Sequence, residues 1–152
     1  MKMKEAAQGR QSEGGAMRQR ILVVDDEKPI RELLRHKLSA SGFEVVTAKN
    51  AKEFWECAFL RKPDLIILDI WLGYKMGPDV YHELLDEGFD KEVPVIFITA
   101  LIEGEPRGSK MLPGQKYALY SKPFDFEKLL FGIHSLLNQE KAAVKSLQGG
   151  EK

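Results

Sequence analysis

The sequence lacks the features of disulfide-stabilised, membrane-spanning and strongly charged proteins. Its single cysteine, Cys57, excludes an internal disulfide and is compatible with a reducing compartment. No apolar run approaches the roughly 18 residues that a membrane-spanning helix needs, and the N-terminus has no apolar core of a secretory signal. The 23 Lys and Arg residues balance the 23 Asp and Glu residues, so the net charge gives no support for direct binding to nucleic acid or to a membrane. The cytoplasm is the expected location.

The chain is expected to form one domain between two tails. Its 152 residues suit a single domain. Residues 1–18 have hardly any large apolar side chain, so we expect a disordered leader. Residues 19–140 have the apolar content for one core. Residues 141–152 look like a frayed helix end that runs into a C-terminal tail.

Short apolar runs alternate with helical patterns along this domain. The runs at 21–24, 65–68 and 95–98 are nearly continuous, which is typical of strands buried on both faces of a parallel sheet. Weaker strand candidates lie at 43–47 and 117–121. Apolar stripes with helical spacing lie between or after the strands, at 30–38, 51–59, 80–85 and 126–137. The alternation predicts an α/β fold with a parallel sheet.

One stretch between two predicted strands does not have a helical pattern. Residues 101–114 contain Gly104, Pro106, Gly108, Pro113 and Gly114. Glycine and proline at this density oppose a regular helix. The fourth helix is therefore expected to be short, distorted or mobile.

Polar residues stand where the predicted strands end. Asp25 and Asp26 follow the first strand, Asp69 follows the third, Thr99 ends the fourth and Lys122 ends the fifth. In an open parallel sheet, ligands bind outside the carboxyl ends of the strands. Each residue alone has a duller interpretation as a helix cap or turn residue. Their joint placement favours a functional site with three carboxylates, one hydroxyl and one ammonium.

The chemistry of this set is coherent. Clustered carboxylates repel one another, so a hard divalent cation would neutralise them. Carboxylate, carbonyl and water ligands suit Mg²⁺ better than zinc. An aspartate can attack phosphorus and form an aspartyl phosphate. A metal ion and a lysine would then stabilise the phosphoryl oxygens, and a threonine hydroxyl would hydrogen-bond them.

Four stretches resemble the receiver domain of two-component response regulators: ILVVDDEKPIR, DLIILDIWLG, VPVIFITA and YSKPF. The resemblance covers about residues 19–140. The spacing agrees with the family, because Asp69 follows Asp26 by 43 residues and Thr99 follows Asp69 by 30. The resemblance implies a flavodoxin-like, doubly wound, five-stranded parallel sheet with strand order 2-1-3-4-5 and flanking helices.

The resemblance also implies a metal and phosphoryl site. Asp69 matches the phospho-acceptor, Asp26 the direct acidic Mg²⁺ ligand, and Asp25 the neighbour that acts through water. The backbone carbonyl of Trp71 would complete the protein ligands of the metal.

The remaining site residues match the family as well. Thr99 matches the hydroxyl residue that turns toward the phosphate, and Lys122 matches the lysine that pairs with it. Pro123 would carry a cis Lys–Pro bond, and Gly77 matches the glycine that opens the helix after the acceptor loop.

The implied function is that of a single-domain response regulator. A sensor histidine kinase or a histidine phosphotransfer protein would donate the phosphoryl group, and the change would switch contact with an unidentified protein. The chain would not be an enzyme beyond its own phosphorylation and dephosphorylation. Two alternatives stay open: a degenerate receiver that is a constitutive interaction module, and a receiver fragment of a larger regulator. An aspartyl phosphatase or mutase would need a second acid where Trp71 stands.

The acceptor loop departs from the family pattern. Gly73 stands where a proline is usual, and Met76 stands where an acidic residue or asparagine is usual. Lys122 follows Thr99 by 23 residues, about one more than usual.

The region expected to signal to a partner, around residues 101–120, departs further from the family pattern. Leu119 occupies the position of the usual aromatic switch, between Tyr117 and Tyr120, and a small register shift would let either tyrosine replace it. With that switch absent, residues 101–114 are the expected two-state element.

Other residues carry weaker interpretations. Trp71 and Leu101 would border the phosphoryl group and either exclude water or be ordinary surface residues. Cys57 is expected to be half-buried. The three histidines are expected on the surface with no phosphohistidine role, at His36, His82 and His134.

Overall fold

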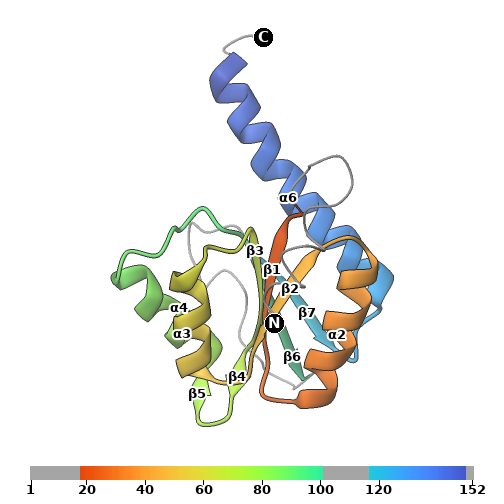
Figure 1. Ribbon diagram of the computed structural model, residues 1–152, viewed down its shortest axis with the longest axis vertical. Helices are drawn as coiled ribbons and strands as arrows, with labels where there is room; N and C mark the ends of the chain where they lie inside the picture. Colours follow the sequence, from red (N-terminus) through yellow and green to blue (C-terminus); the bar gives the residue numbers. More distant parts are fainter. Residues whose placement is uncertain (1–17, 101–116, 150–152) are drawn as a thin grey trace, which may run out of the picture.

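The computed structural model describes residues 18–100 and 117–149, and for residues 100, 117 and 139–149 it describes the backbone alone. A five-stranded sheet forms the centre (Figure 1). Its strands pair in parallel in the order β2-β1-β3-β6-β7, which confirms the predicted flavodoxin-like sheet. The strands are β1 (Arg20–Val24), β2 (Glu44–Ala48), β3 (Leu65–Asp69), β6 (Val95–Ala100) and β7 (Tyr117–Lys122).

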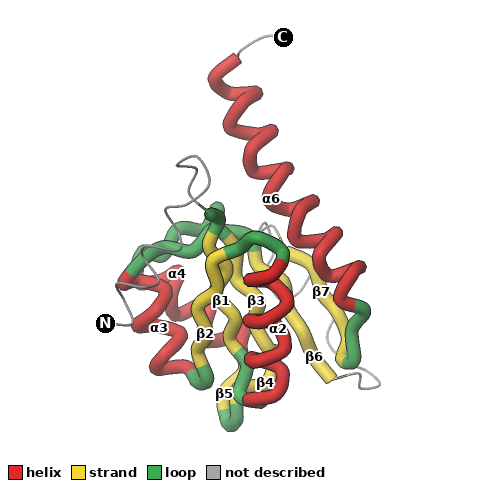
Figure 2. Tube along the Cα trace, turned by 45° about the vertical axis from the view of Figure 1, so that its right-hand side comes forward, coloured by secondary structure: helices red, strands yellow, loops and turns green. Residues whose placement is uncertain are grey.

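Helices cover both faces of the sheet, because its central strands are apolar on both sides. The helices α2 (Lys28–Ala40) and α6 (Phe126–Gly149) lie on one face, and α3 (Ala51–Leu60) and α4 (Gly77–Asp86) lie on the other (Figure 2). Ile21 and Val23 of β1 belong to the core under α2 and α6, and Leu22 belongs to the core under α3 and α4. The sheet is thus buried on both faces, as continuous apolar strands require.

Local sequence signals fix where the helices at the site begin. The side chain of Asn50 accepts a hydrogen bond from the backbone N–H of Glu53, and the Glu53 carboxylate accepts one from the backbone N–H of Lys49. This reciprocal capping starts α3. Pro29 lies in the first turn of α2, where its missing N–H costs nothing. Both helices therefore begin at the edge of the sheet where the strands end.

The structure adds a hairpin that the sequence patterns did not predict. Two-residue strands β4 (Trp71–Leu72) and β5 (Lys75–Met76) pair antiparallel directly after β3. Gly73 allows the turn, because its φ of 67° lies in the left-handed region that favours glycine. The glycine that replaces the family's usual proline therefore has a structural consequence: the chain doubles back here.

Helix α6 is longer than its apolar stripe. It runs from Phe126 to Gly149, past residue 140, where the sequence indicated a frayed end. Ala, Lys, Leu and Gln between residues 141 and 148 are good helix formers. The segment 101–114, the expected site of a distorted fourth helix, lies outside the described residues. Within the described part of the chain, no helix combines the length and apolarity needed to cross a bilayer.

Candidate functional site

Strands β1 and β3 bring three carboxylates together at the carboxyl edge of the sheet. Asp25 and Asp26 follow β1, and Asp69 is the last residue of β3. One oxygen from each lies within 4.8 Å of the others. Asp25 and Asp69 are buried, at 2% and 5% exposure, whereas Asp26 is exposed. The cluster is therefore open to solvent on the Asp26 side and could hold a metal ion.

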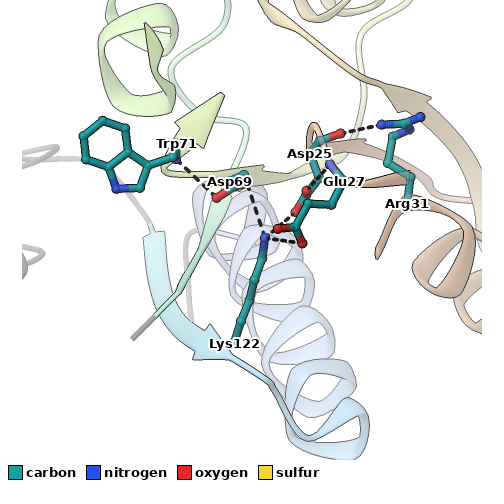
Figure 3. A network of polar contacts seen from close by, with 6 residues as sticks. All are labelled: Asp25, Glu27, Arg31, Asp69, Trp71 and Lys122. Carbon is teal, nitrogen blue, oxygen red and sulfur yellow. Dashed lines mark hydrogen bonds and ion pairs between the residues drawn. The ribbon is translucent and has the colours of Figure 1, made fainter. Parts of the chain in front are cut away.

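Lys122 approaches this cluster from β7. Its Nζ lies 3.0 Å from Asp25 Oδ2 and 3.3 Å from Asp69 Oδ2 (Figure 3). Glu27 Oε1 lies 3.4 Å from the same ammonium. The contact with Glu27 joins residues 95 positions apart in the chain, and the sequence patterns did not indicate it. One lysine thus faces several carboxylates.

Burial shapes the protonation of the cluster. Burial, and after it the charge of Asp25, raise the pKa of Asp69 to about 6 against the opposing effect of Lys122. Burial is also the main cause that raises the pKa of Asp25. Burial alone would lower the pKa of Lys122, but its contacts with Asp25 and Asp69 outweigh it and raise the pKa. The two buried carboxylates need more positive charge than Lys122 supplies, and a divalent cation fits that demand.

Backbone contacts hold Asp25 in place. Its Oδ1 accepts a hydrogen bond of 2.8 Å from the backbone N–H of Glu27. The Arg31 guanidinium donates a 2.9 Å hydrogen bond to the Asp25 carbonyl oxygen. Glu27 is the N-cap of α2 but makes no side-chain capping bond. The capping interpretation of Asp25 was therefore partly right, since its side chain binds an N–H at the start of this helix.

The hairpin closes the acceptor loop around Asp69. The backbone N–H of Trp71 donates to Asp69 Oδ1 at 3.2 Å, and the N–H of Gly77 donates to the carbonyl of Ile70 at 2.6 Å. Because Ile70 and Gly77 are hydrogen-bonded, the next pair, Trp71 and Met76, is a non-hydrogen-bonded pair of this antiparallel ladder. Gly77 has no room for a side chain, since a Cβ there would lie 2.2 Å from the Asp69 carbonyl oxygen.

Thr99 and Lys122 reach the same edge through the strand register. Asp69 pairs with Ile98, so Thr99 lies one residue beyond it. Ala100 then pairs with Lys122 on β7. Thr99 is buried at 2% exposure. The five side chains expected at the strand ends thus lie at one edge, and the Lys122–Pro123 bond is cis, as the resemblance implied.

The family of the chain follows from its sequence match. The family model described as response regulator receiver domain matches residues 21–134. The chain belongs to this receiver-domain family.

The receiver domain is similar to regulators that are longer than this chain. It is 34% identical over 122 residues to the response regulator MprA of Mycobacterium leprae, a match that covers 80% of this chain and 52% of the relative. It resembles NtrX of Brucella abortus with a TM-score of 0.74 at 31% identity, over 87% of this chain and 30% of NtrX. The chain spans about half the length of the curated relatives it matches.

A solved structure of similar size carries a metal. The receiver domain resembles the response regulator TrrA of Thermotoga maritima, solved in complex with Mg²⁺ and BeF, with a TM-score of 0.65 at 34% identity. That match covers 78% of this chain and 98% of TrrA.

This receiver domain has no aromatic residue at the usual switch position. Strand β7 pairs with β6 through six successive residues without a bulge, so the suggested register shift is absent. Leu119 packs on the core under α3 and α4. Tyr120 packs on the opposite core, and its hydroxyl donates to the Lys128 carbonyl of α6. Tyr120 therefore does not replace the switch residue, and the side chain of Tyr117 lies outside the described part.

The other side chains singled out from the sequence differ in their exposure. Trp71 is 49% exposed, and its indole ring points away from Asp25 and Lys122 (Figure 3). Leu101, its expected partner beside the phosphoryl group, lies outside the described residues. Cys57 is half-buried, and burial raises its pKa. The three histidines are exposed, as expected: His36, His82 and His134.

Proposed function

We propose that this receiver domain accepts a phosphoryl group on Asp69 in a Mg²⁺-dependent reaction and thereby switches a protein contact. One observation carries the proposal: Asp69 Oδ2 lies 3.3 Å from the Lys122 ammonium, within a cluster of three carboxylates. A carboxylate placed beside a cation and a metal-binding cluster can serve as a nucleophile toward phosphorus.

The carboxylate oxygens of Asp26 and Asp69 would hold Mg²⁺ directly, and Asp25 would hold it through water. The Trp71 carbonyl would complete the set, because its non-hydrogen-bonded ladder position leaves it available. The ion supplies positive charge that neutralises the phosphoryl oxygens. Both oxygens of Asp25 already accept protein donors, Glu27 N–H and Lys122 Nζ, which suits a ligand that acts through water.

In the transfer step, an Asp69 carboxylate oxygen attacks phosphorus. The new oxygen–phosphorus bond forms while the bond to the donor's leaving atom breaks, and that atom keeps the electron pair. Lys122 stabilises charge on the phosphoryl oxygens, and the buried Thr99 hydroxyl donates a hydrogen bond to one of them. Lys122 would then exchange part of its contact with Asp25 for the phosphoryl group.

The donor would be a sensor histidine kinase or a histidine phosphotransfer protein, and the cytoplasm remains the proposed location. Residues 19–140 would form the receiver, between a leader at 1–18 and a tail at 141–152. The observation that the chain spans half the length of its curated relatives favours a second candidate, in which this receiver controls further domains of a larger regulator.

Intact-protein mass spectrometry tests the acceptor. Incubation with phosphoramidate and Mg²⁺ should add one phosphoryl group, and EDTA should prevent the addition. Asp69→Asn should abolish labelling, whereas Asp79→Asn, an exposed acid on α4, should label like the native chain. Equal labelling of Asp69→Asn would rule out the assignment. A native chain that takes no label would favour the constitutive interaction module.

A further inference from the structure

A pocket adjoins the acidic cluster on the side away from Lys122. It lies between the start of α3 and the β4–β5 hairpin and has a volume of about 380 Å³. Asp26 belongs both to its wall and to the carboxylate cluster. Lys122 comes from β7, at the other edge of the sheet from β2. A molecule that contacts Asp69 can therefore extend past Asp26 into this pocket. The size is within the range of about 300–1,000 Å³ of small-molecule sites.

The wall of the pocket is cationic. Lys49, Lys52 and Lys75 line it, and among the described lining residues Asp26 carries the only carboxylate. Lys52 lies 3.7 Å from Glu56, and Lys75 lies 3.6 Å from Glu83. Both pairs are at the surface, where water weakens such contacts. The lysines therefore remain able to bind an incoming anion.

The lysine side chains supply full positive charges to the wall. At the start of α3, the Asn50 side chain accepts the backbone N–H of Glu53, and the Glu53 carboxylate accepts that of Lys49. Tyr74 and Leu72 add an apolar part to the wall. The pocket thus combines several ammonium groups with a small apolar surface, which matches a carboxylate on a short carbon chain.

We propose that this pocket binds the carboxylate leaving group of an acyl phosphate that phosphorylates Asp69, an inference that rests on the proposed function. An Asp69 oxygen attacks phosphorus, and the bond between phosphorus and the acyl oxygen breaks. The acyl oxygen keeps the electron pair, so the donor leaves as a carboxylate anion. No proton is needed, since one carboxylate is consumed and one is released.

The two sides of the cluster then have different tasks. Lys122 stabilises the phosphoryl group, while Lys49 and Lys75 stabilise the negative charge that grows on the leaving carboxylate. Groups that meet charge as it develops lower the barrier more than groups that meet it only in the bound donor. Phosphoramidate gains nothing from these lysines, because its nitrogen takes up a proton and leaves as neutral ammonia.

A comparison of two donors tests the pocket. Labelling rates of the full chain with acetyl phosphate and with phosphoramidate, both with Mg²⁺, are measured for the native protein and for Lys49→Gln/Lys75→Gln. The control is Lys62→Gln, which removes a lysine that pairs with Asp90 and precedes the start of β3. The double variant should label roughly three- to tenfold more slowly with acetyl phosphate and at an unchanged rate with phosphoramidate. The control should change neither rate.

A binding measurement separates this inference from the proposed function. In EDTA, phosphonoacetate, which carries a carboxylate but cannot transfer phosphorus, should shift the NMR signals of backbone amides 49–52 and 73–75. Methylphosphonate, which lacks the carboxylate, should not shift them, and the double variant should lose the response. Equal slowing with both donors, or no amide shift with phosphonoacetate, would overturn the pocket assignment. Labelling by neither donor would overturn the proposed function, while the titration still decides whether the pocket binds carboxylates.

Discussion

The carbonyl oxygen of Asp69 occupies the space that a side chain at Gly77 would need. A Cβ at Gly77 would lie 2.2 Å from that oxygen, and the atom belongs to the backbone, so it cannot swing aside. Glycine at this position therefore sets the distance between the acceptor strand and α4. Any larger residue must move one of them.

Gly77→Ala should destabilise the fold by about 1–3 kcal/mol, because it overpacks a rigid contact, and should slow phosphorylation of Asp69. Urea unfolding and labelling rates measure the two effects. Gly132→Ala is the matched control, since its Cβ would meet the far end of the Tyr120 side chain, which can move. The control gains helix propensity of up to about 1 kcal/mol. A smaller loss for Gly77→Ala than for Gly132→Ala would contradict the packing argument.

Burial of the Asp69 carboxylate should lower the free energy of unfolding at neutral pH when no metal is bound. The pKa of Asp69 is raised from 3.8 to about 6, so the folded state holds the proton more tightly than the unfolded state. The free energy of unfolding should therefore fall as pH rises through this window and stay lower above it.

Asp69→Asn removes that effect. In EDTA the variant should be more stable than the native chain by about 1–3 kcal/mol at about pH 7, and the difference should shrink toward about pH 4. Urea unfolding at both pH values measures it, with Asp79→Asn as the exposed control. A variant that is less stable at pH 7 would refute the burial argument.

The two aspartates after β1 should contribute unequally to metal binding. Asp25 has both oxygens engaged by Glu27 and Lys122, whereas Asp26 is exposed at the open side of the cluster. Asp25→Asn should weaken Mg²⁺ binding on the order of tenfold, and Asp26→Asn should weaken it more. Fluorescence of Trp71, next to the site, follows the titration. Equal Mg²⁺ affinities of the two variants would contradict this ranking.

The hydroxyl of Tyr81 should destabilise the core. Tyr81 is fully buried, and its hydroxyl has no hydrogen-bond partner among the described residues. Tyr81→Phe should raise the free energy of unfolding by about 1 kcal/mol, while Tyr74→Phe, at 96% exposure, should leave it unchanged.

The same residue gives an alkaline test. Burial raises the pKa of Tyr81 to about 12, so an unfolded chain ionises this tyrosine first. Stability of the native chain should fall as pH rises above 10, the ordinary value, and Tyr81→Phe should lessen that fall. Identical alkaline profiles would contradict a raised pKa of Tyr81.

The site was predictable where it depends on strand ends, and not where it depends on loops. Asp25, Asp69 and Lys122 follow apolar strands, and a parallel sheet brings such residues to one edge. The strand order came with the family resemblance, because pairing joins residues far apart in the chain. The hairpin at 71–76 was missed, since two-residue strands have no period to detect. The contact between Glu27 and Lys122 was missed because it depends on the finished fold.

The length of α6 turns it into a lever. Its 24 residues span about 36 Å, and Leu137 is the last buried side chain of the helix among those that the structure describes. The helix continues for about 18 Å beyond Leu137, and its axis runs well past the body of the domain (Figure 1). The base of α6 packs with Ala118 and Tyr120 of β7, the strand that ends in Lys122. A tilt of about 10° at that base would carry the far end roughly 6 Å, so a small adjustment around Lys122 becomes a displacement large enough for another molecule to sense.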